Sequence, residues 1–487
     1  MARRTAVIDI GSNSVRMIIL ERTSRLGFYL LNEVKSRVRI SEGSYENGGN
    51  LQPQAIERAI AALKEFLTIA KNLKVKKILA VATSAVREAP NKKEFLSRAK
   101  KELNLNIKVI EGEKEAFFGA VAAMNLLPIN ECVTIDIGGG STDLALIKNN
   151  EIKQCVSLDL GTVRLKELFF DKKSTIKEAL VYIKEELKKI PPEFRSDTVV
   201  GIGGTLRALS KSIMESDNYP LDKLHGFSYS FKEHQGYIKK LIESPTGKLK
   251  KFNIKKDRYD TIREGCLIFY ETVRQIRAET VITSGAGVRE GLFLYDLLRN
   301  HNFRFPKNFN PSLKSLLDRF CIDPKASACI YRNSLKIYEA LHHLFDPEKR
   351  YEKELGMAAK LLNIGIYVDF YEHHKHSSYI ILNDLEYGVS HEEIALTALL
   401  VRYHKRKLPS NSSLKSFKKL LPPQKKVEWL SFILSLAEIL NRDLECSRFE
   451  IHYSRNCIKI ESDKKLYLAK EEIKNLQKPA PLAVLID

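Results

Sequence analysis

A glycine-rich turn between two aspartates is the stretch of this chain best suited to chemistry. Residues 133–147 read Val-Thr-Ile-Asp-Ile-Gly-Gly-Gly-Ser-Thr-Asp-Leu-Ala-Leu-Ile, so that Asp136 precedes the turn and Asp143 follows it. Consecutive glycines let the backbone approach a ligand closely, and successive N–H groups in such a turn can converge on an anion. We interpret the stretch as a β-hairpin whose tip binds phosphate between two carboxylates. The tip residues are Gly138, Gly139, Gly140, Ser141 and Thr142.

A second copy of this design lies near the start of the chain. Residues 5–20 read Thr-Ala-Val-Ile-Asp-Ile-Gly-Ser-Asn-Ser-Val-Arg-Met-Ile-Ile-Leu, so that the stretch from Asp9 parallels the one from Asp136. Its polar turn residues are Asn13, Ser14 and Arg16. One glycine-rich turn usually only reverses the chain, whereas two related copies indicate a duplicated domain with one phosphate loop in each half.

Strands that alternate with helices must position these turns, and this order is typical of α/β architecture. A strand at 198–202 ends in Gly203, Gly204 and Thr205, which open a helix whose N-terminus could bind a further phosphate. Asn91 with Glu94 predicts a capping box for another helix. The other expected strands are 5–10, 15–21, 27–34, 77–83, 107–110, 132–137, 142–148, 152–158 and 280–283.

The character of the chain changes after about residue 301. A linker-like Asn-Phe-Asn-Pro stretch at 308–311 precedes helical periodicity from 312 to about 445. Residues 448–460 and 466–468 are expected to be short strands. We therefore expect three domains, which cover residues 1–124, 125–300 and 301–487.

The composition favours a partner of negative charge. The chain has 487 residues, an ordinary apolar fraction of 44% and a net charge of +20. Such a balance suits nucleic acid, anionic lipid or a phosphate-rich substrate. The lysine pairs are scattered, which argues against a dedicated basic tail.

The cysteines and the apolar runs indicate in which cellular compartment the protein is expected. The seven cysteines form an odd count with no C-x-x-C pair, which is typical of free thiols in a reducing compartment. No apolar run approaches the length of a membrane span, and no apolar segment of a signal peptide precedes Asp9. We expect a cytoplasmic protein.

Several motifs in this order resemble the exopolyphosphatase / guanosine pentaphosphate phosphohydrolase (Ppx/GppA) family. The resemblance implies a duplicated actin-like (ribonuclease H-like) two-domain core and, after residue 300, the all-helical HD-like domain of longer family members. The motifs are Asp-Ile-Gly-Ser-Asn-Ser (9–14), Ala-Thr-Ser-Ala-Val-Arg (82–87), Glu-Gly-x-x-Glu-Ala (111–116), Asp-Ile-Gly-Gly-Gly-Ser-Thr (136–142), Gly-Ile-Gly-Gly-Thr (201–205) and Ser-Gly-Ala-Gly-Val-Arg-Glu-Gly (284–291).

The resemblance assigns roles that the residue types alone leave open. It implies that Glu115 is the general base, although Glu113 competes and both could merely favour a helix N-terminus. It implies that Asp9 and Asp136 bind Mg²⁺ or another divalent cation. Asp143 stands where the family usually has glutamate, with a role in positioning water or metal. Arg87 matches a family arginine that would bind phosphate.

Other candidates are weaker. We expect structural roles for Arg164 and Arg289. The histidines at 373, 374, 376 and 404 suggest a metal, but a metal-dependent HD site needs an adjacent His-Asp pair, and this chain has Leu362-Asn363 at the matching place. We therefore expect no metal there, with His376 and His404 as hydrogen-bonded core or groove residues.

The leading hypothesis is hydrolysis of the terminal phosphoanhydride of inorganic polyphosphate, with pppGpp as a second substrate that is converted to ppGpp. A dedicated pppGpp phosphohydrolase remains open within the same class. An actin-like ATP-dependent kinase or chaperone is a second class, and a non-catalytic sensor of polyphosphate or alarmone is a third. No membrane or nucleic acid partner is expected, and relatives suggest a homodimer.

Overall fold

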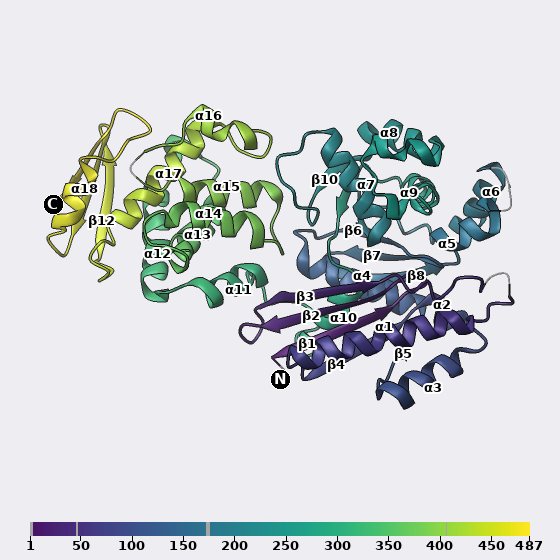
Figure 1. Ribbon diagram of the computed structural model, residues 1–487. Helices are drawn as coiled ribbons and strands as arrows, with labels where there is room; N and C mark the ends of the chain where they lie inside the picture. Colours follow the sequence, from purple (N-terminus) through teal and green to yellow (C-terminus); the bar gives the residue numbers. More distant parts are fainter. Residues whose placement is uncertain (1–2, 45–46, 172–175, 406) are drawn as a thin grey trace. The chain divides into compact units, whose positions relative to one another are not determined.

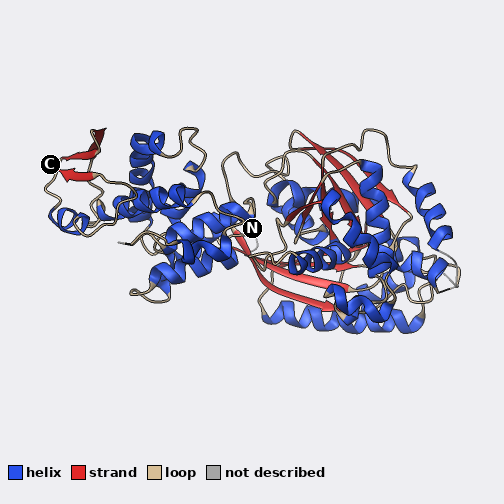
Figure 2. Ribbon diagram, turned by 90° about the horizontal axis from the view of Figure 1, so that it is seen from above, coloured by secondary structure: helices blue, strands red, loops and turns tan. Residues whose placement is uncertain are grey.

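The computed structural model describes residues 3–44, 47–171, 176–405 and 407–487, which fold as two compact units. The units are Met1–Phe309 and Asn310–Asp487. Figures 1 and 2 show a first unit built on two β-sheets and a second built mainly from helices. The division of the first unit at residue 124 and the start of the last domain at 301 remain our own proposals.

The first unit contains two sheets that share the arrangement of their central strands. One sheet has the strand order β3-β2-β1-β4-β5 and the other β10-β11-β9-β6-β7-β8. In each, three consecutive antiparallel strands are extended by parallel strands: β4 joins β1 in one sheet, and β9 joins β6 in the other. The strands are β1 (Arg4–Ile10), β2 (Val15–Arg22), β3 (Phe28–Ser36), β4 (Lys77–Ala82), β5 (Lys108–Val109), β6 (Cys132–Ile137), β7 (Thr142–Lys148), β8 (Glu151–Leu158), β9 (Thr198–Ile202), β10 (Ser228–Ser230) and β11 (Thr280–Thr283).

Helices cover both sheets (Figure 1). Pro53 fixes the first turn of α1, and Ile56, Ile60 and Leu63 form its buried face at helical spacing. The long helices are α1 (Pro53–Asn72), α3 (Lys92–Leu103), α4 (Gly112–Leu126), α6 (Ile176–Leu187), α7 (Gly203–Ser216), α8 (Phe231–Glu243), α9 (Ile262–Ile276) and α10 (Val288–Leu297). The short ones include α2 (Ser84–Glu88), α5 (Thr162–Leu165), η1 (Lys166–Phe170), η2 (Thr246–Phe252) and η3 (Lys256–Arg258).

Helix α4 joins the two halves of the first unit. It packs against α10 and against β7 and β8 of the second sheet, and α10 packs in turn on β1 of the first. The crossing of α4 and α10 is so close that a Cβ on Gly291 would lie 1.8 Å from the Phe118 carbonyl oxygen. Only glycine fits at that position, which lets α10 approach the second turn of α4 closely.

The capping box expected at Asn91 does not form. The Asn91 side chain accepts from the Leu51 N–H and donates to the Leu51 carbonyl instead of capping α3. A contact with a distant segment therefore takes the place of the local cap.

The second unit is a helical bundle with a small sheet at its end. Its core includes α17, which is buried on nearly all sides, as expected of a helix that is apolar all round. The elements are α11 (Pro311–Phe320), α12 (Pro324–Leu341), η4 (His342–Leu344), α13 (Glu352–Leu361), η5 (Ile364–Tyr367), α14 (His373–Asp384), α15 (His391–Arg402), α16 (Asn411–Leu414), η6 (Lys415–Phe417), α17 (Gln424–Ile439), β12 (Phe449–Ser454), β13 (Cys457–Ser462), α18 (Tyr467–Ile473) and β14 (Ala483–Ile486).

Two expectations for this unit are wrong. Residues 466–468 do not form a strand, because Leu466, Ala469 and Ile473 lie at helical spacing and are buried together at α18. The cysteines are not all free thiols, since Cys329 and Cys446 form a disulfide across 117 residues. Within the described ranges, no helix is both long enough and apolar enough to span a membrane.

Candidate active site

The two glycine-rich turns are closed by the same hydrogen bond. The Gly11 N–H donates to the Ser14 carbonyl at 3.2 Å, and the Gly138 N–H donates to the Ser141 carbonyl at 2.9 Å. The duplication predicted from the sequence therefore extends to backbone geometry. The duplication predicted from the sequence does not extend to every side chain.

The two copies differ in the residue opposite the aspartate. Asp9 pairs with Arg16 across β1 and β2, whereas Asp136 pairs with Asp143 across β6 and β7. One turn thus carries a carboxylate and a guanidinium, and the other carries two carboxylates.

The turns face each other across a cleft. A Cβ on Gly139 would lie 2.9 Å from the Ser12 Cβ, so glycine permits this approach. The Ser12 hydroxyl is also within hydrogen-bond distance, 3.2 Å, of the Ser84 hydroxyl at the start of α2. The cleft holds a cavity of about 150 Å³.

Most of the predicted site residues line this cavity. Those on its wall are Asp9, Asn13, Ser14, Arg16, Glu115, Asp136, Gly138, Gly139, Ser141, Gly203, Gly204 and Thr205. Gly140, Thr142, Asp143 and Arg87 are not on the wall. The Thr142 hydroxyl donates to the Leu160 carbonyl, and the Gly140 carbonyl accepts from Arg164 at 2.8 Å, so both support the turn from behind.

Glu115 lies in the first turn of α4, where its side chain is 13% exposed. Its Oε2 atom is buried and has no hydrogen-bond partner within the described residues. Burial raises the pKa of Glu115 well above its ordinary value, and the nearby Asp143, Asp9 and Asp136 carboxylates raise it further. A carboxylate with a raised pKa and a free lone pair is suited to accept a proton near neutral pH.

Asp143 lies behind the cavity wall, next to the start of α4. The Ser157 hydroxyl donates to its Oδ1 at 2.5 Å, and the Ser141 hydroxyl donates to its Oδ2 at 3.1 Å. A Cβ on Gly112 would lie 2.1 Å from the Ser157 Oγ, so the first residue of α4 must be glycine. Burial raises the pKa of Asp143 to about 7, although both serine hydrogen bonds oppose the rise.

Asp9 and Asp136 end the central strands of the two sheets. Burial raises the pKa of both, that of Asp136 to about 6. Gly203 has a φ of +91°, and a Cβ there would lie 2.6 Å from the Asp136 Oδ1, so the start of α7 closes on this carboxylate.

These carboxylates fit a hard divalent cation. The buried Oδ1 of Asp9, like the Oε2 of Glu115, lacks a hydrogen-bond partner in the described part of the chain. Carboxylate oxygens without protein donors are the ligands that Mg²⁺ prefers, usually with several waters retained.

Three arginines that the sequence analysis missed or ranked low also line the cavity: Arg207, Arg258 and Arg289. Arg207 donates to the Gly285 carbonyl at 2.9 Å and to the Gly203 carbonyl at 3.2 Å. Arg289, expected to be structural, is 6% exposed and pairs with Glu33 at 2.7 Å. Arg207 could have been predicted from its place four residues after Gly203, at the start of the second turn of α7, whereas no local pattern marks Arg258.

Arg164 does behave as expected. Its guanidinium donates to Glu88 at 2.6 Å and to the Gly140 carbonyl, so it links α5 to α2. It does not line the cavity.

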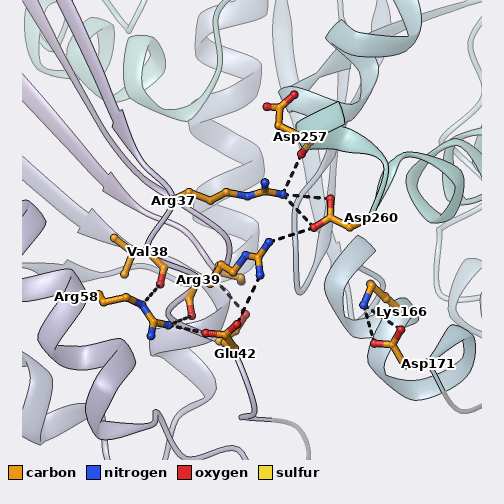
Figure 3. Close-up of polar contacts among 11 residues, drawn as sticks. Arg37, Val38, Arg39, Glu42, Arg58, Lys166, Asp171, Asp257 and Asp260 are labelled. Carbon is orange, nitrogen blue, oxygen red and sulfur yellow. Dashed lines mark hydrogen bonds and ion pairs between the residues drawn. The ribbon is translucent and has the colours of Figure 1, made fainter. Parts of the chain in front are cut away.

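At the outer edge of the cleft, arginines from the first half meet aspartates from the second (Figure 3). Arg37, just after β3, donates to Asp260 at 3.0 Å and to the Asp257 carbonyl at 2.9 Å. Arg39 lies 3.6 Å from Asp260 and also 3.6 Å from Glu42. These contacts adjoin a second cavity of about 260 Å³, which shares Ser12 and other wall residues with the first.

The duplicated sheets, with one turn from each facing a shared cleft, define an actin-like two-lobed core. The chain belongs to the Ppx/GppA phosphatase family, which matches residues 6–301, and the Ppx/GppA phosphatase domain III matches residues 310–481. It is therefore an enzyme of a phosphatase family.

Individual relatives agree with this placement. A protein of Aeromonas hydrophila named guanosine-5'-triphosphate,3'-diphosphate pyrophosphatase is 28% identical over 412 residues, which cover 81% of this chain and 79% of the relative. The crystal structure of the Aquifex aeolicus Ppx/GppA family member is 31% identical, with a TM-score of 0.53, over 62% of this chain and 99% of that one. An exopolyphosphatase from Cytophaga hutchinsonii is 25% identical, with a TM-score of 0.54, over 60% of this chain and 97% of that one.

Proposed function

We propose that this enzyme hydrolyses the terminal phosphoanhydride of inorganic polyphosphate and also converts pppGpp to ppGpp. The observation that carries the proposal is the Glu115 carboxylate, unpartnered at Oε2, beside the two glycine-rich turns. A base at that position can take a proton from water that attacks a phosphoryl group held by the turns.

The binding groups match the charge of the substrate. The backbone N–H groups of the turns, including that of Ser141, and of the α7 N-terminus would donate to phosphoryl oxygens, together with the hydroxyls of Ser14 and Thr205. Arg16, Arg207 and Arg258 would add positive charge from the cavity wall. Arg87, which lies behind Glu115, would orient that carboxylate.

Asp9 and Asp136 would hold a divalent cation, Mg²⁺ by preference. When bound, such a cation supplies positive charge that neutralises phosphoryl oxygens in the transition state. Asp143 stays in the proposal in a supporting role, because its hydrogen bonds to Ser141 and Ser157 keep its negative charge close to Glu115.

The net charge of +20 favours the long polyanion as the main substrate. A dedicated pppGpp phosphohydrolase is the second candidate, and the name of the Aeromonas hydrophila relative favours it. A panel of polyphosphate lengths, pppGpp, GTP and ATP decides between them by kcat/KM. A higher value for pppGpp than for long polyphosphate would reverse the ranking.

The same panel, with sugars added to the ATP reaction, tests the other classes. Phosphate transfer from ATP to a sugar without hydrolysis would point to a kinase, and no phosphate release with Mg²⁺ present would point to a sensor. We also propose a homodimer, which light scattering on the purified protein would test.

A further inference from the structure

The second unit contains a cluster of buried lone-pair donors that the proposed phosphatase chemistry does not use. His373 begins α14, His404 follows α15 and Glu438 lies near the end of α17. One ligand atom from each residue lies within 4.8 Å of the other two. Three helices thus bring two imidazoles and a carboxylate to one point.

Both histidines carry their proton on the nitrogen that faces away from this point. The Nδ1 of His373 lies 2.8 Å from the Phe370 carbonyl oxygen, and the Nδ1 of His404 lies 2.6 Å from the Val401 carbonyl oxygen. A carbonyl only accepts, so each Nδ1 must be the N–H donor. In a neutral ring the Nε2 atom is then a bare lone pair.

These two Nε2 atoms are buried, and neither has a hydrogen-bond partner among the residues that the structure describes. The side chains are nearly enclosed, with exposures of 6% for His373 and 1% for His404. The His404 Nε2 lies 3.3 Å from a Glu438 carboxylate oxygen without forming a hydrogen bond. The nitrogen lone pair and the carboxylate oxygen both carry negative charge density, so they repel each other unless a cation lies between them.

A single bound proton cannot satisfy all the buried acceptors of this cluster. A single proton on Glu438 could satisfy one ring nitrogen but would leave the other unpaired, at the cost that a buried unsatisfied polar group carries.

We propose that His373 Nε2, His404 Nε2 and the Glu438 carboxylate bind one divalent transition metal ion, with Zn²⁺ as the best fit. Two imidazoles and one carboxylate form a known zinc donor set that leaves a coordination position open. Histidines that bind metal usually donate their other ring N–H to a backbone carbonyl, as both do here. Mg²⁺ is a poorer fit, because it prefers oxygen ligands alone.

The cluster needs a modest contraction to bind an ion. In a tetrahedral site with ligand bonds of about 2.0–2.2 Å, two donors lie roughly 3.3–3.6 Å apart. Side chains whose ligand atoms lie within 4.8 Å of one another therefore need to close by about 1–1.5 Å at most.

The three proposed ligands line a cavity. His373, His404 and Glu438 line a cavity of about 550 Å³, whose wall also carries Lys375, Arg402, Lys405 and Arg442. Water or a small anion could enter along this basic wall and complete the coordination. The site lies in the second unit, and the inference does not depend on the proposed polyphosphatase activity.

The first test is the metal content of the full-length protein. The protein is purified without a histidine tag, stripped with a chelator, loaded with Zn²⁺ in excess Mg²⁺ and gel-filtered. Mass spectrometry of the metals should find about one Zn²⁺ per chain, and zinc-edge X-ray absorption should find two imidazole nitrogens among light ligands. A wild-type protein that retains no Zn²⁺, or whose Zn²⁺ has only oxygen ligands, would overturn the proposal.

The second test assigns the ligands. Glu438→Gln keeps the shape of the side chain, and His373→Gln removes one ring; each should weaken Zn²⁺ binding at least tenfold in a competition with a chelating dye. His376→Gln is the matched control, because His376 lies on the same helix outside the cluster and should leave binding unchanged. Equal binding by all three variants and the wild type would refute the assignment. If a variant fails to fold, the absorption spectrum of the wild type still decides the question.

Discussion

Arg87 holds its guanidinium 3.5 Å from the Glu115 carboxylate while its Nη1 donates to the Ile110 carbonyl at 2.9 Å. The ion pair is therefore not a hydrogen bond, and the Glu115 Oε2 stays unpartnered within the described residues. The positive charge opposes the rise of the Glu115 pKa without occupying its lone pair. This arrangement keeps a buried carboxylate available to accept a proton.

Glu115→Gln should lower kcat by about 10²–10⁴, the usual range for loss of a general base, with little change in KM. The substitution also removes a buried charge, so the melting temperature should stay the same or rise. Phosphate release and thermal melts measure the two effects. Glu113→Gln is the control, since Glu113 is exposed on the same turn of α4 and should keep full activity. Unchanged phosphate release by Glu115→Gln would remove Glu115 as the base.

Asp143→Asn should move the acidic limb of the kcat/KM profile to lower pH. The negative charge of Asp143 is among the causes that raise the pKa of Glu115, so its removal lets Glu115 deprotonate at lower pH. Because the Asp143 charge acts on the Glu115 pKa, two interacting groups shape the limb of the wild type, and the variant should show the shallower limb of a single group. Ser157→Ala is the comparison, because it removes one hydrogen bond and keeps the charge. If the acidic limb does not move, the charge of Asp143 does not influence the pKa of Glu115.

Glu264→Gln should stabilise the protein above pH 7 and have no effect near pH 4. Burial raises the pKa of Glu264 from 4.5 to about 7, so between these values the folded protein holds a proton that the unfolded chain has lost. The free energy of unfolding then falls as pH rises through this window, by about 3 kcal/mol in total. Urea unfolding of both proteins at pH 4 and pH 8 measures the difference. A stabilisation that is equal at the two pH values would contradict the assigned pKa.

The Arg37–Asp260 pair should act on substrate binding more than on stability. Both side chains are about one-third exposed, and exposed pairs contribute about 0–1 kcal/mol to the free energy of unfolding. The pair joins the two halves at the cleft edge (Figure 3), so Arg37→Met and Asp260→Asn should each change KM two- to fivefold with kcat nearly constant. The KM of the double variant should be close to that of either single variant, as expected for coupled residues.

Arg98→Met is the control for the Arg37 and Asp260 variants, because Arg98 pairs with Glu102 and Glu57 within the first half. It should leave KM unchanged. Strictly additive effects of the two cleft substitutions would show that Arg37 and Asp260 act independently.

Local patterns predicted the parts of the cleft that depend on a few neighbouring residues. Both turns, the strand-end aspartates and the start of α7 follow from glycines and carboxylates at strand ends, where backbone conformation is decided within the motif. The family resemblance drew attention to Glu115. Arg258 was missed because its guanidinium lies within 2.6 Å of where a Gly204 Cβ would be, a contact between distant segments that no local spacing reveals.

What the local patterns did not predict has the same origin. Asn91 looked like a cap, but Leu51 offers it two hydrogen bonds from a segment outside its own helix. The proposed metal ligands could not be grouped from the sequence, because Glu438 lies on a different helix from His373 and far along the chain from both histidines. Tertiary contacts decide both cases, and sequence spacing does not contain them.

The Cys329–Cys446 disulfide should be detectable as a difference in free thiols. It ties α12 to the segment after α17, and the remaining cysteines at 132, 155, 266, 321 and 457 are free. In denaturant, thiol titration should therefore find five thiols per chain before reduction and seven after it. Closure of a loop of this length is worth about 4–5 kcal/mol in the chain-entropy account, so Cys446→Ser should lower the urea midpoint clearly. Cys321→Ser is the control, because it removes a free thiol and should leave the difference between oxidised and reduced protein intact. Seven reactive thiols in protein that was never exposed to reductant would contradict the bond.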